Sequence, residues 1–165
     1  MIQEYFSIPV QDHLHFVRRQ ELLETGIDAA DLIMDTFYEK SYARMQIFGR
    51  ALVESFLFME GKCIVSYIRK KVMDFYGVKP KDLDGIVSQL RNTRGVEVAI
   101  FMYELDQNVF KVSLRSGNEV DVSKIAGYFG GGGHEKASGV TMTGTPQDIL
   151  NNLAERIDEQ LKGQA

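Results

Sequence analysis

The chain has 165 residues, of which 44% are hydrophobic and 25% are charged. These fractions are ordinary for a globular protein and argue against a disordered, collagen-like or coiled-coil chain. No apolar run approaches the roughly 20 residues of a membrane-spanning helix. Met1–Val10 shows no secretion signal, and Cys63 is the single cysteine, so no intrachain disulfide can form. Together these features predict a cytoplasmic protein.

The net charge of −4 excludes a basic field over the whole chain for non-specific binding of nucleic acid. The charge is unevenly distributed, because residues 1–60 carry five basic and ten acidic side chains, whereas residues 61–165 carry 14 and 13. Any anion-binding site must therefore be local, and we expect it in the second part of the chain.

The first sixty residues predict helices and no strand. One apolar stripe fits the face of a single long helix that ends at Gly61, and it consists of Met45, Phe48, Leu52, Phe56 and Met59. We therefore expect a helical linker or lead-in over residues 1–60 and a second domain over residues 61–165. If the stripe faces a domain that this chain lacks, its exposure favours a homodimer.

From residue 62 the pattern alternates between strands and helices. Cys63–Ile68 predicts a strand with a buried cysteine, and Arg69–Tyr76 predicts a helix that Gly77 ends. Asp82 is expected to cap a further helix that stops before Gly95.

The middle of the chain predicts a β-hairpin. Val96–Leu105 is apolar on both faces, which is typical of a strand inside a sheet. Residues 106–108 have turn chemistry, and Val109–Ser116 then alternates between apolar and polar side chains.

The last third of the chain predicts a short helix, a strand and a long helix. The helix spans Val122–Phe129 and the strand spans Val140–Thr143. Thr145 is expected to cap the last helix, with a proline at its first position and an acid in its first turn.

Four consecutive glycines, Gly130 to Gly133, stand directly before His134. Glycine lets backbone N–H groups converge on an anion without obstruction by side chains, and a helical turn after the run would add its dipole. The alternative is a flexible linker with a surface histidine. The run lies between a predicted helix and a predicted strand, with Ser138 and Gly139 close by, and a linker does not need close packing on both sides. We therefore interpret the run as an anion-binding loop.

Arg115 ends a strand whose polar face also carries Lys111 and Ser113. A guanidinium group binds phosphate through two parallel hydrogen bonds. An arginine at a strand end is more often a solvated side chain. The phosphate interpretation gains weight if the hairpin end and the glycine run converge.

Two motifs occur together in this region. Val112–Ser116 reads VSLRS, and about 14 residues later Gly131–Gly139 reads GGGHEKASG. The pair resembles the DHHA1 domain of the DHH phosphoesterases, whose signature is GGGH-x-x-A-[AS]-G preceded by an S-x-R-S strand end. Asp84–Val87 and Gly95–Ala99 also resemble the oligoribonuclease-like members, and the likeness covers roughly residues 28–162. The nearest group is the small oligoribonucleases that also hydrolyse 3′-phosphoadenosine 5′-phosphate.

The resemblance implies an α/β fold in which a central mixed β-sheet is flanked by helices and preceded by a helical linker segment. It implies a substrate-binding C-terminal domain of a DHH-family phosphodiesterase or phosphatase, which binds short single-stranded RNA or nucleotide phosphates. By motif position, the phosphate contacts would be Arg115, Ser116, His134, the backbone amides of Gly131, Gly132 and Gly133 and, as a further candidate, Lys136.

In such enzymes an N-terminal DHH domain carries the hydrolysis and holds two divalent metals, usually Mn²⁺, with Asp and His ligands. This chain has no D-x-D on a predicted strand and no D-H-H triad. Residues 12–15, with His13 and His15, superficially resemble a metal motif, but no apolar strand precedes them and no partner carboxylates complete a two-metal site. We therefore expect no catalytic residue and no metal in this chain, Mn²⁺ in a DHH domain outside it, and no catalysis by the chain alone.

Two alternatives stay open at this point. One is a nucleic-acid-binding module like the related C-terminal domain of alanyl-tRNA synthetase, which grips tRNA and shares the GGGH-type signature. The other is an interaction domain in which the glycine run is only structural.

Overall fold

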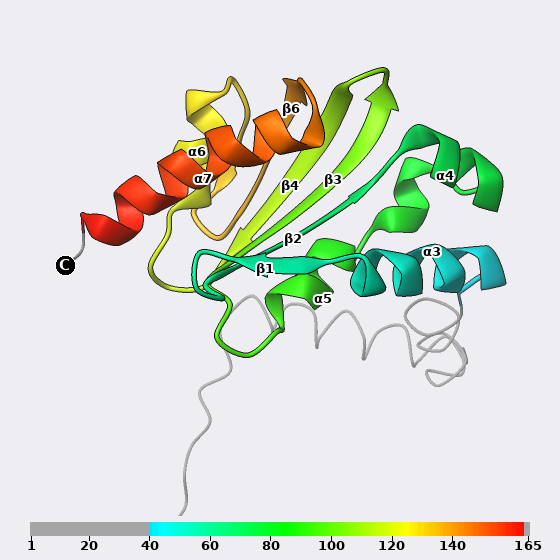
Figure 1. Cartoon of the computed structure of the whole chain (residues 1–165), viewed down its shortest axis with the longest axis horizontal. Coiled ribbons are helices and arrows are strands. Elements are labelled where there is room, and N and C mark those ends of the chain that lie inside the picture. The colour runs from blue at the N-terminus through cyan, green and yellow to red at the C-terminus, as the bar shows by residue number, and fades with distance from the viewer. Residues whose placement is uncertain (1–39, 164–165) are drawn as a thin grey trace, which may run out of the picture. The chain divides into compact units, whose positions relative to one another are not determined.

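The computed structural model describes residues 40–163, which form a six-stranded sheet with helices on both sides (Figure 1). The elements follow in chain order as α3 (Tyr42–Val53), β1 (Phe56–Phe58), β2 (Cys63–Ile68), α4 (Lys70–Tyr76), the 3-10 helix η2 (Pro80–Leu83), α5 (Ile86–Arg91), β3 (Val98–Asp106), β4 (Val109–Ser116), α6 (Val122–Tyr128), β5 (Gly132–His134), β6 (Ala137–Thr143) and α7 (Pro146–Lys162). The strand order is β1-β2-β3-β4-β6-β5, with β2 and β3 parallel and every other pair antiparallel. The sheet is therefore mixed, and the predicted α/β class is confirmed.

The alternation of side chains along the strands divides the interior into two cores. On one face, α6 and α7 cover a core that includes Val112 and Leu114; we call this the α7 face. On the other face, α3, α4 and α5 cover a core that includes Ile64 and Phe101; we call this the α5 face. Figure 1 shows α7 on one side of the sheet and α3 and α5 on the other. β3 is buried on both faces over its first five residues, as predicted for a central strand.

The predicted hairpin of β3 and β4 is confirmed. Asn108 makes the turn with a φ of 55°, a left-handed conformation that asparagine tolerates, and its backbone N–H donates to Glu104 Oε1 at 3.2 Å. The register places Arg115 opposite Ala99. Because Ala99 belongs to the core of the α5 face, Arg115 projects from that same face.

The long helix predicted to reach Met59 is wrong in its last third. α3 ends at Val53, and Phe56–Phe58 instead form β1, which pairs with β2 at the edge of the sheet. Met59 and Glu60 both have positive φ, so the chain turns sharply there and cannot continue a helix. The region before residue 60 therefore contributes a strand, which the sequence did not predict.

The helix predicted to start at Asp82 is in fact two short helices. Gly85 lies between them with a φ of 94°, and the Asp82 carboxylate accepts the N–H of Lys79 at 2.8 Å, so that it caps η2 and not α5. The start of α7 agrees with its prediction. Thr145 and Asp148 form a capping box, in which each side chain accepts the backbone N–H of the other.

Cys63 is fully buried in β2, as predicted. Burial raises the pKa of its thiol to about 12, and the charge of Glu97 acts in the same direction. The cysteine is therefore a small apolar core residue and not a reactive thiol.

The compact unit that contains the sheet begins at Ser41, and it includes α3 and β1. The predicted division of the chain at residue 60 stays a prediction. In the described part of the chain, no helix is both long and apolar enough to cross a membrane.

Candidate phosphate-binding site

Arg115 and His134 lie in one row across three neighbouring strands. Arg115 in β4 is opposite Ala137 in β6, and Ala137 is in turn opposite His134 in β5. Residues that are paired in this way project from the same face of a sheet. Two strand spacings of about 4.8 Å place the Cα atoms of Arg115 and His134 about 10 Å apart. The hairpin end and the glycine run therefore converge on the α5 face.

The next row along these strands is nearly bare. It consists of Ser113 in β4, Gly139 in β6 and Gly132 in β5. Two of the three positions carry no side chain, so the backbone itself forms the surface beside Arg115 and His134. His134 and Gly132 are exposed, and Arg115 is half-buried, with one guanidinium N–H donating to the Leu114 carbonyl at 2.9 Å.

The fold requires glycine at some positions of the run and not at others. A Cβ on Gly131 would collide with the Gly139 carbonyl and would lie 2.5 Å from Val140 Cβ. A Cβ on Gly133, where φ is 146°, would lie 2.5 Å from the Ala137 carbonyl oxygen. A Cβ on Gly132 would meet nothing within 4 Å, and its φ lies outside the left-handed region. The fold therefore explains Gly131 and Gly133 but does not require a glycine at position 132.

The second half of the glycine run belongs to the edge strand β5 and not to the start of a helix. β5 pairs only with β6, and residues 135 and 136 form the tight turn between these two strands. The predicted contribution of a helix dipole is wrong, because β6 and not a helical turn follows the run. Backbone amides on the outer side of an edge strand have no partner strand, so they could donate to an oxyanion. Gly131 is different, since its N–H already donates to the Ala126 carbonyl at 2.7 Å.

Two predicted phosphate ligands, Ser116 and Lys136, have partners within the fold. The Ser116 hydroxyl donates to the Glu135 carbonyl at 3.3 Å, and Ser116 is opposite Val98, a residue of the α7 face. Lys136 Nζ donates to the Gly117 carbonyl at 2.6 Å and to Asn118 Oδ1 at 2.7 Å. These contacts tie the β5–β6 turn to the end of β4. A direct contact of either side chain with phosphate stays a prediction.

Glu97 is a supporting residue that the sequence reasoning missed. Its side chain is buried, and its carboxylate accepts the backbone N–H groups of the four residues 117–120 at 2.8–3.2 Å. A Cβ on Gly117 would collide with this carboxylate and with the Arg91 guanidinium. Glu97 and Gly117 therefore fix the loop that follows Arg115 and Ser116. The one available signal was a single acid beside a strand that is otherwise apolar.

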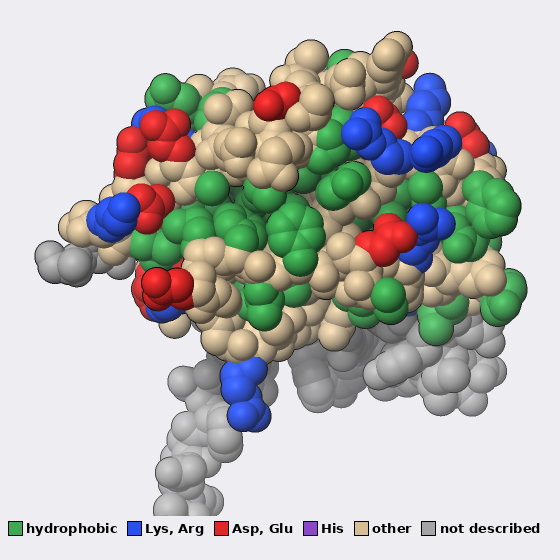
Figure 2. Space-filling view, in the orientation of Figure 1, with side chains coloured by type: hydrophobic (Ala, Val, Ile, Leu, Met, Phe, Trp, Pro, Cys, Tyr) green, Lys and Arg blue, Asp and Glu red, His purple; other side chains and the backbone are tan. Residues whose placement is uncertain are grey.

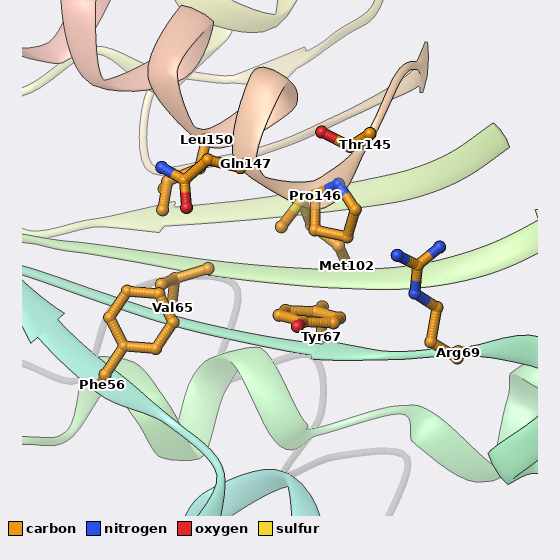
Figure 3. Close-up of a pocket in the computed structure, with 9 residues that line it drawn as sticks. All are labelled: Phe56, Val65, Tyr67, Arg69, Met102, Thr145, Pro146, Gln147 and Leu150. Atoms are coloured by element: carbon orange, nitrogen blue, oxygen red, sulfur yellow. The ribbon is translucent and has the colours of Figure 1, made fainter. Parts of the chain in front are cut away.

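A separate groove of about 300 Å³ lies on the α7 face. Figure 3 shows the nine residues that line it: Phe56, Val65, Tyr67, Arg69, Met102, Thr145, Pro146, Gln147 and Leu150. Figure 2 shows hydrophobic side chains gathered in the middle of this view, and Phe56 and Tyr67 are 44% and 38% exposed. The one cation of the lining, Arg69, already pairs with Glu104 at 3.1 Å. The groove therefore has both polar and apolar lining residues and lies on the face opposite to Arg115 and His134, and the expected homodimer stays a prediction.

No three His, Cys, Asp or Glu side chains among residues 40–163 come close enough together to hold a metal ion. The segment 12–15 with His13 and His15 lies outside the described residues. The chemistry that the described site supports is the binding of an oxyanion by a guanidinium group, an imidazole and backbone amides.

The described residues thus form a mixed α/β sheet with a glycine-rich edge strand, β5, two strands away from an arginine at the end of β4. Residues 60–163 match the DHHA1 domain family, and the chain belongs to this family. The resemblance inferred from the two sequence motifs is therefore confirmed.

Two curated relatives are similar over most of this chain. The bifunctional oligoribonuclease and PAP phosphatase NrnA of Thermus thermophilus is 28% identical over 86% of this chain and 42% of its own length. Oligoribonuclease NrnB of Bacillus subtilis is 33% identical over 77% of this chain and 35% of its own length. The chain therefore spans less than half the length of these relatives.

A solved structure supports the fold. An exopolyphosphatase-related protein from Bacteroides fragilis superimposes with a TM-score of 0.78 and 24% identity, over 91% of this chain and 44% of that one. At this level of identity the likeness concerns the fold alone.

Proposed function

We propose that this chain is the substrate-binding part of a DHH-family phosphoesterase and that it binds short single-stranded RNA or nucleotide phosphates. The observation that carries the proposal is the row of Arg115 and His134 beside the bare backbone of Gly132 and Gly139. Guanidinium and imidazole groups donate to phosphate oxygens, and the missing side chains let those oxygens approach the backbone. The names of the curated relatives, an oligoribonuclease and PAP phosphatase and an oligoribonuclease, support the same class of ligand.

In this proposal the hydrolysis belongs to a DHH domain outside this chain, which holds the divalent metal, expected to be Mn²⁺. The part proposed for the described residues is to bind and orient the substrate. The metal, when bound in that domain, would supply an activated water for attack on phosphorus. Arg115 and His134 would donate hydrogen bonds to a phosphate of the substrate, and the Arg115 guanidinium would balance part of its charge.

The binding role is tested by NMR titration of the chain with a 5′-phosphorylated dinucleotide and with folded tRNA. Arg115→Ala and His134→Ala should each weaken dinucleotide binding by about 1–3 kcal/mol, the range for losing a charged hydrogen-bond partner. Lys162→Met is the control, because Lys162 lies on α7 and pairs with Asp158. Unchanged affinity in both variants would favour a structural role of the glycine run, and a marked preference for tRNA would favour the tRNA-binding alternative.

The division of labour has its own test. The purified chain, incubated with Mn²⁺ and either short RNA or 3′-phosphoadenosine 5′-phosphate, should release no product. Robust turnover would show that a separate catalytic domain is not needed.

A further inference from the structure

A second cationic position lies on the α5 face, beyond the bare glycine row. Lys111 in β4 is opposite Thr141 in β6, so these two residues form the next row after Ser113, Gly139 and Gly132. At about 3.4 Å per residue, the Cα atoms of Lys111 and Arg115 are about 14 Å apart along β4. The bare row thus has a cation on each side.

The Lys111 side chain extends over the bare row. Its Cε atom lies 3.9 Å from the position that a Cβ on Gly139 would occupy, so the alkyl stem crosses from its own row to the bare row. Within residues 40–163 Lys111 has no hydrogen bond and no ion pair, whereas Lys62 pairs with Glu119 and Lys136 holds the loop after β4. Lys111 is nevertheless half-buried. An ammonium group that has no partner within the fold is free to pair with an anionic ligand.

We propose that Lys111 binds a second phosphate of the ligand, one nucleoside away from the phosphate that Arg115 and His134 hold. The inference rests on the proposed function and adds the number and spacing of the phosphates. Because the Lys111 stem reaches the bare row, the end of the stem is one row away from the row of Arg115, and one row is about 7 Å, the advance of two residues along a strand. Two phosphates that bracket one nucleoside have a comparable separation. The nucleoside would lie above the backbone of Gly132, beside the Lys111 stem that covers Gly139.

Two kinds of ligand carry two phosphates on either side of one nucleoside, namely a nucleoside 3′,5′-bisphosphate and a 5′-phosphorylated dinucleotide. A nucleoside 5′-monophosphate offers only one of the two phosphates. The proposal therefore predicts that Lys111 distinguishes the first two ligands from the third, whereas Arg115 acts on all three.

The experiment is an NMR titration of the 165-residue chain with each of the three ligands. Lys111→Met keeps the alkyl stem over Gly139 and removes the charge. We expect it to weaken binding of a two-phosphate ligand by about 10- to 100-fold, the loss for one charged hydrogen bond, and to leave monophosphate binding unchanged. Lys111→Arg should retain most of the affinity. Lys162→Met, on α7, is the matched control and should change nothing.

The outcomes separate the two proposals. A loss confined to the bisphosphate, or one shared with the dinucleotide, supports the inference and identifies the ligand source. An equal loss for all three ligands, or no loss for any, overturns the inference while the proposed function stands. If the unchanged chain binds none of the three, the proposed function fails and the inference falls with it.

Discussion

Replacement of Gly132 by alanine separates a ligand-binding role of the glycine run from a structural one. The methyl group would project from the α5 face, because Gly132 shares a row with Ser113 and Gly139. No atom lies within 4 Å of it, and the backbone conformation suits any residue. The folded state therefore loses nothing, and the lower entropy of the unfolded chain should stabilise the variant by about 0.4–1 kcal/mol. The same methyl group occupies the surface that a bound phosphate would approach.

Stability and affinity should thus change in opposite directions in Gly132→Ala. Urea denaturation should show a higher midpoint, and NMR titration with a 5′-phosphorylated dinucleotide should show binding weakened by about 1.5–3 kcal/mol, the worth of one hydrogen bond to a charged group. Gly133→Ala should instead destabilise the chain by about 1–3 kcal/mol, since its φ is 146° and the Ala137 carbonyl oxygen lies 2.5 Å from the new Cβ.

Gly127→Ala provides the matched control. Gly127 lies in α6, and a Cβ there would meet nothing within 4 Å, so alanine should stabilise the helix by up to about 1 kcal/mol without any effect on affinity. If Gly132→Ala binds the dinucleotide as tightly as the unchanged chain does, the assignment of the bare row to the ligand is refuted.

Three further results are expected. Asp121 caps α6, and the hydrogen bond from the Ser123 hydroxyl, helped by backbone amides, lowers its pKa below the ordinary 3.8; Asp121→Ala should cost about 1 kcal/mol at neutral pH. Since the lowered pKa belongs to the folded state, this difference in urea stability should shrink as the pH falls below 3.8 and through the folded value, and a constant difference would contradict the assignment. The Cys63 thiol should resist iodoacetamide at about pH 8 in the folded chain, because burial raises its pKa to about 12, so rapid labelling would exclude the buried position. Glu97→Ala should destabilise the chain by about 3 kcal/mol or more, because it leaves the N–H groups of residues 118–120 without an acceptor, and Glu97→Gln should lose less; unchanged hydrogen exchange of residues 118–120 would contradict this role.

Long elements were predictable because each carries its own period. The alternation of β4 and the capping residues of α7 are local features, and both appear in the structure where the sequence placed them. β1 could not be predicted in the same way, because three residues are too few to show a period of two. Phe56 fits the helical stripe by its spacing, and only its pairing with Val65 in β2 makes it part of a strand.

In the candidate site, too, local features could be predicted and features that depend on strand pairing could not. The residue types at Arg115 and His134 and their motif spacing predicted a phosphate site, but the row that joins them depends on the pairing of β4, β6 and β5. β5 is almost entirely glycine and has no side-chain pattern to read. The role of Glu97 could not be predicted for another reason. Its partners are backbone N–H groups 20 to 23 residues later in the chain, and backbone groups have no sequence signature.

The turn at Asn108 has a consequence at the opposite end of β4. A slip of one residue in the pairing of β4 would move its polar residues to the α7 face and its apolar residues to the α5 face, because neighbouring residues on a strand point to opposite sides. The left-handed Asn108 and the register shift between Glu104 and Asp106 set the frame in which β4 is paired. The conformation of the turn at Asn108 thus determines from which face of the sheet Arg115 projects. A substitution that changes this turn would abolish the proposed phosphate site without replacing any residue of the site.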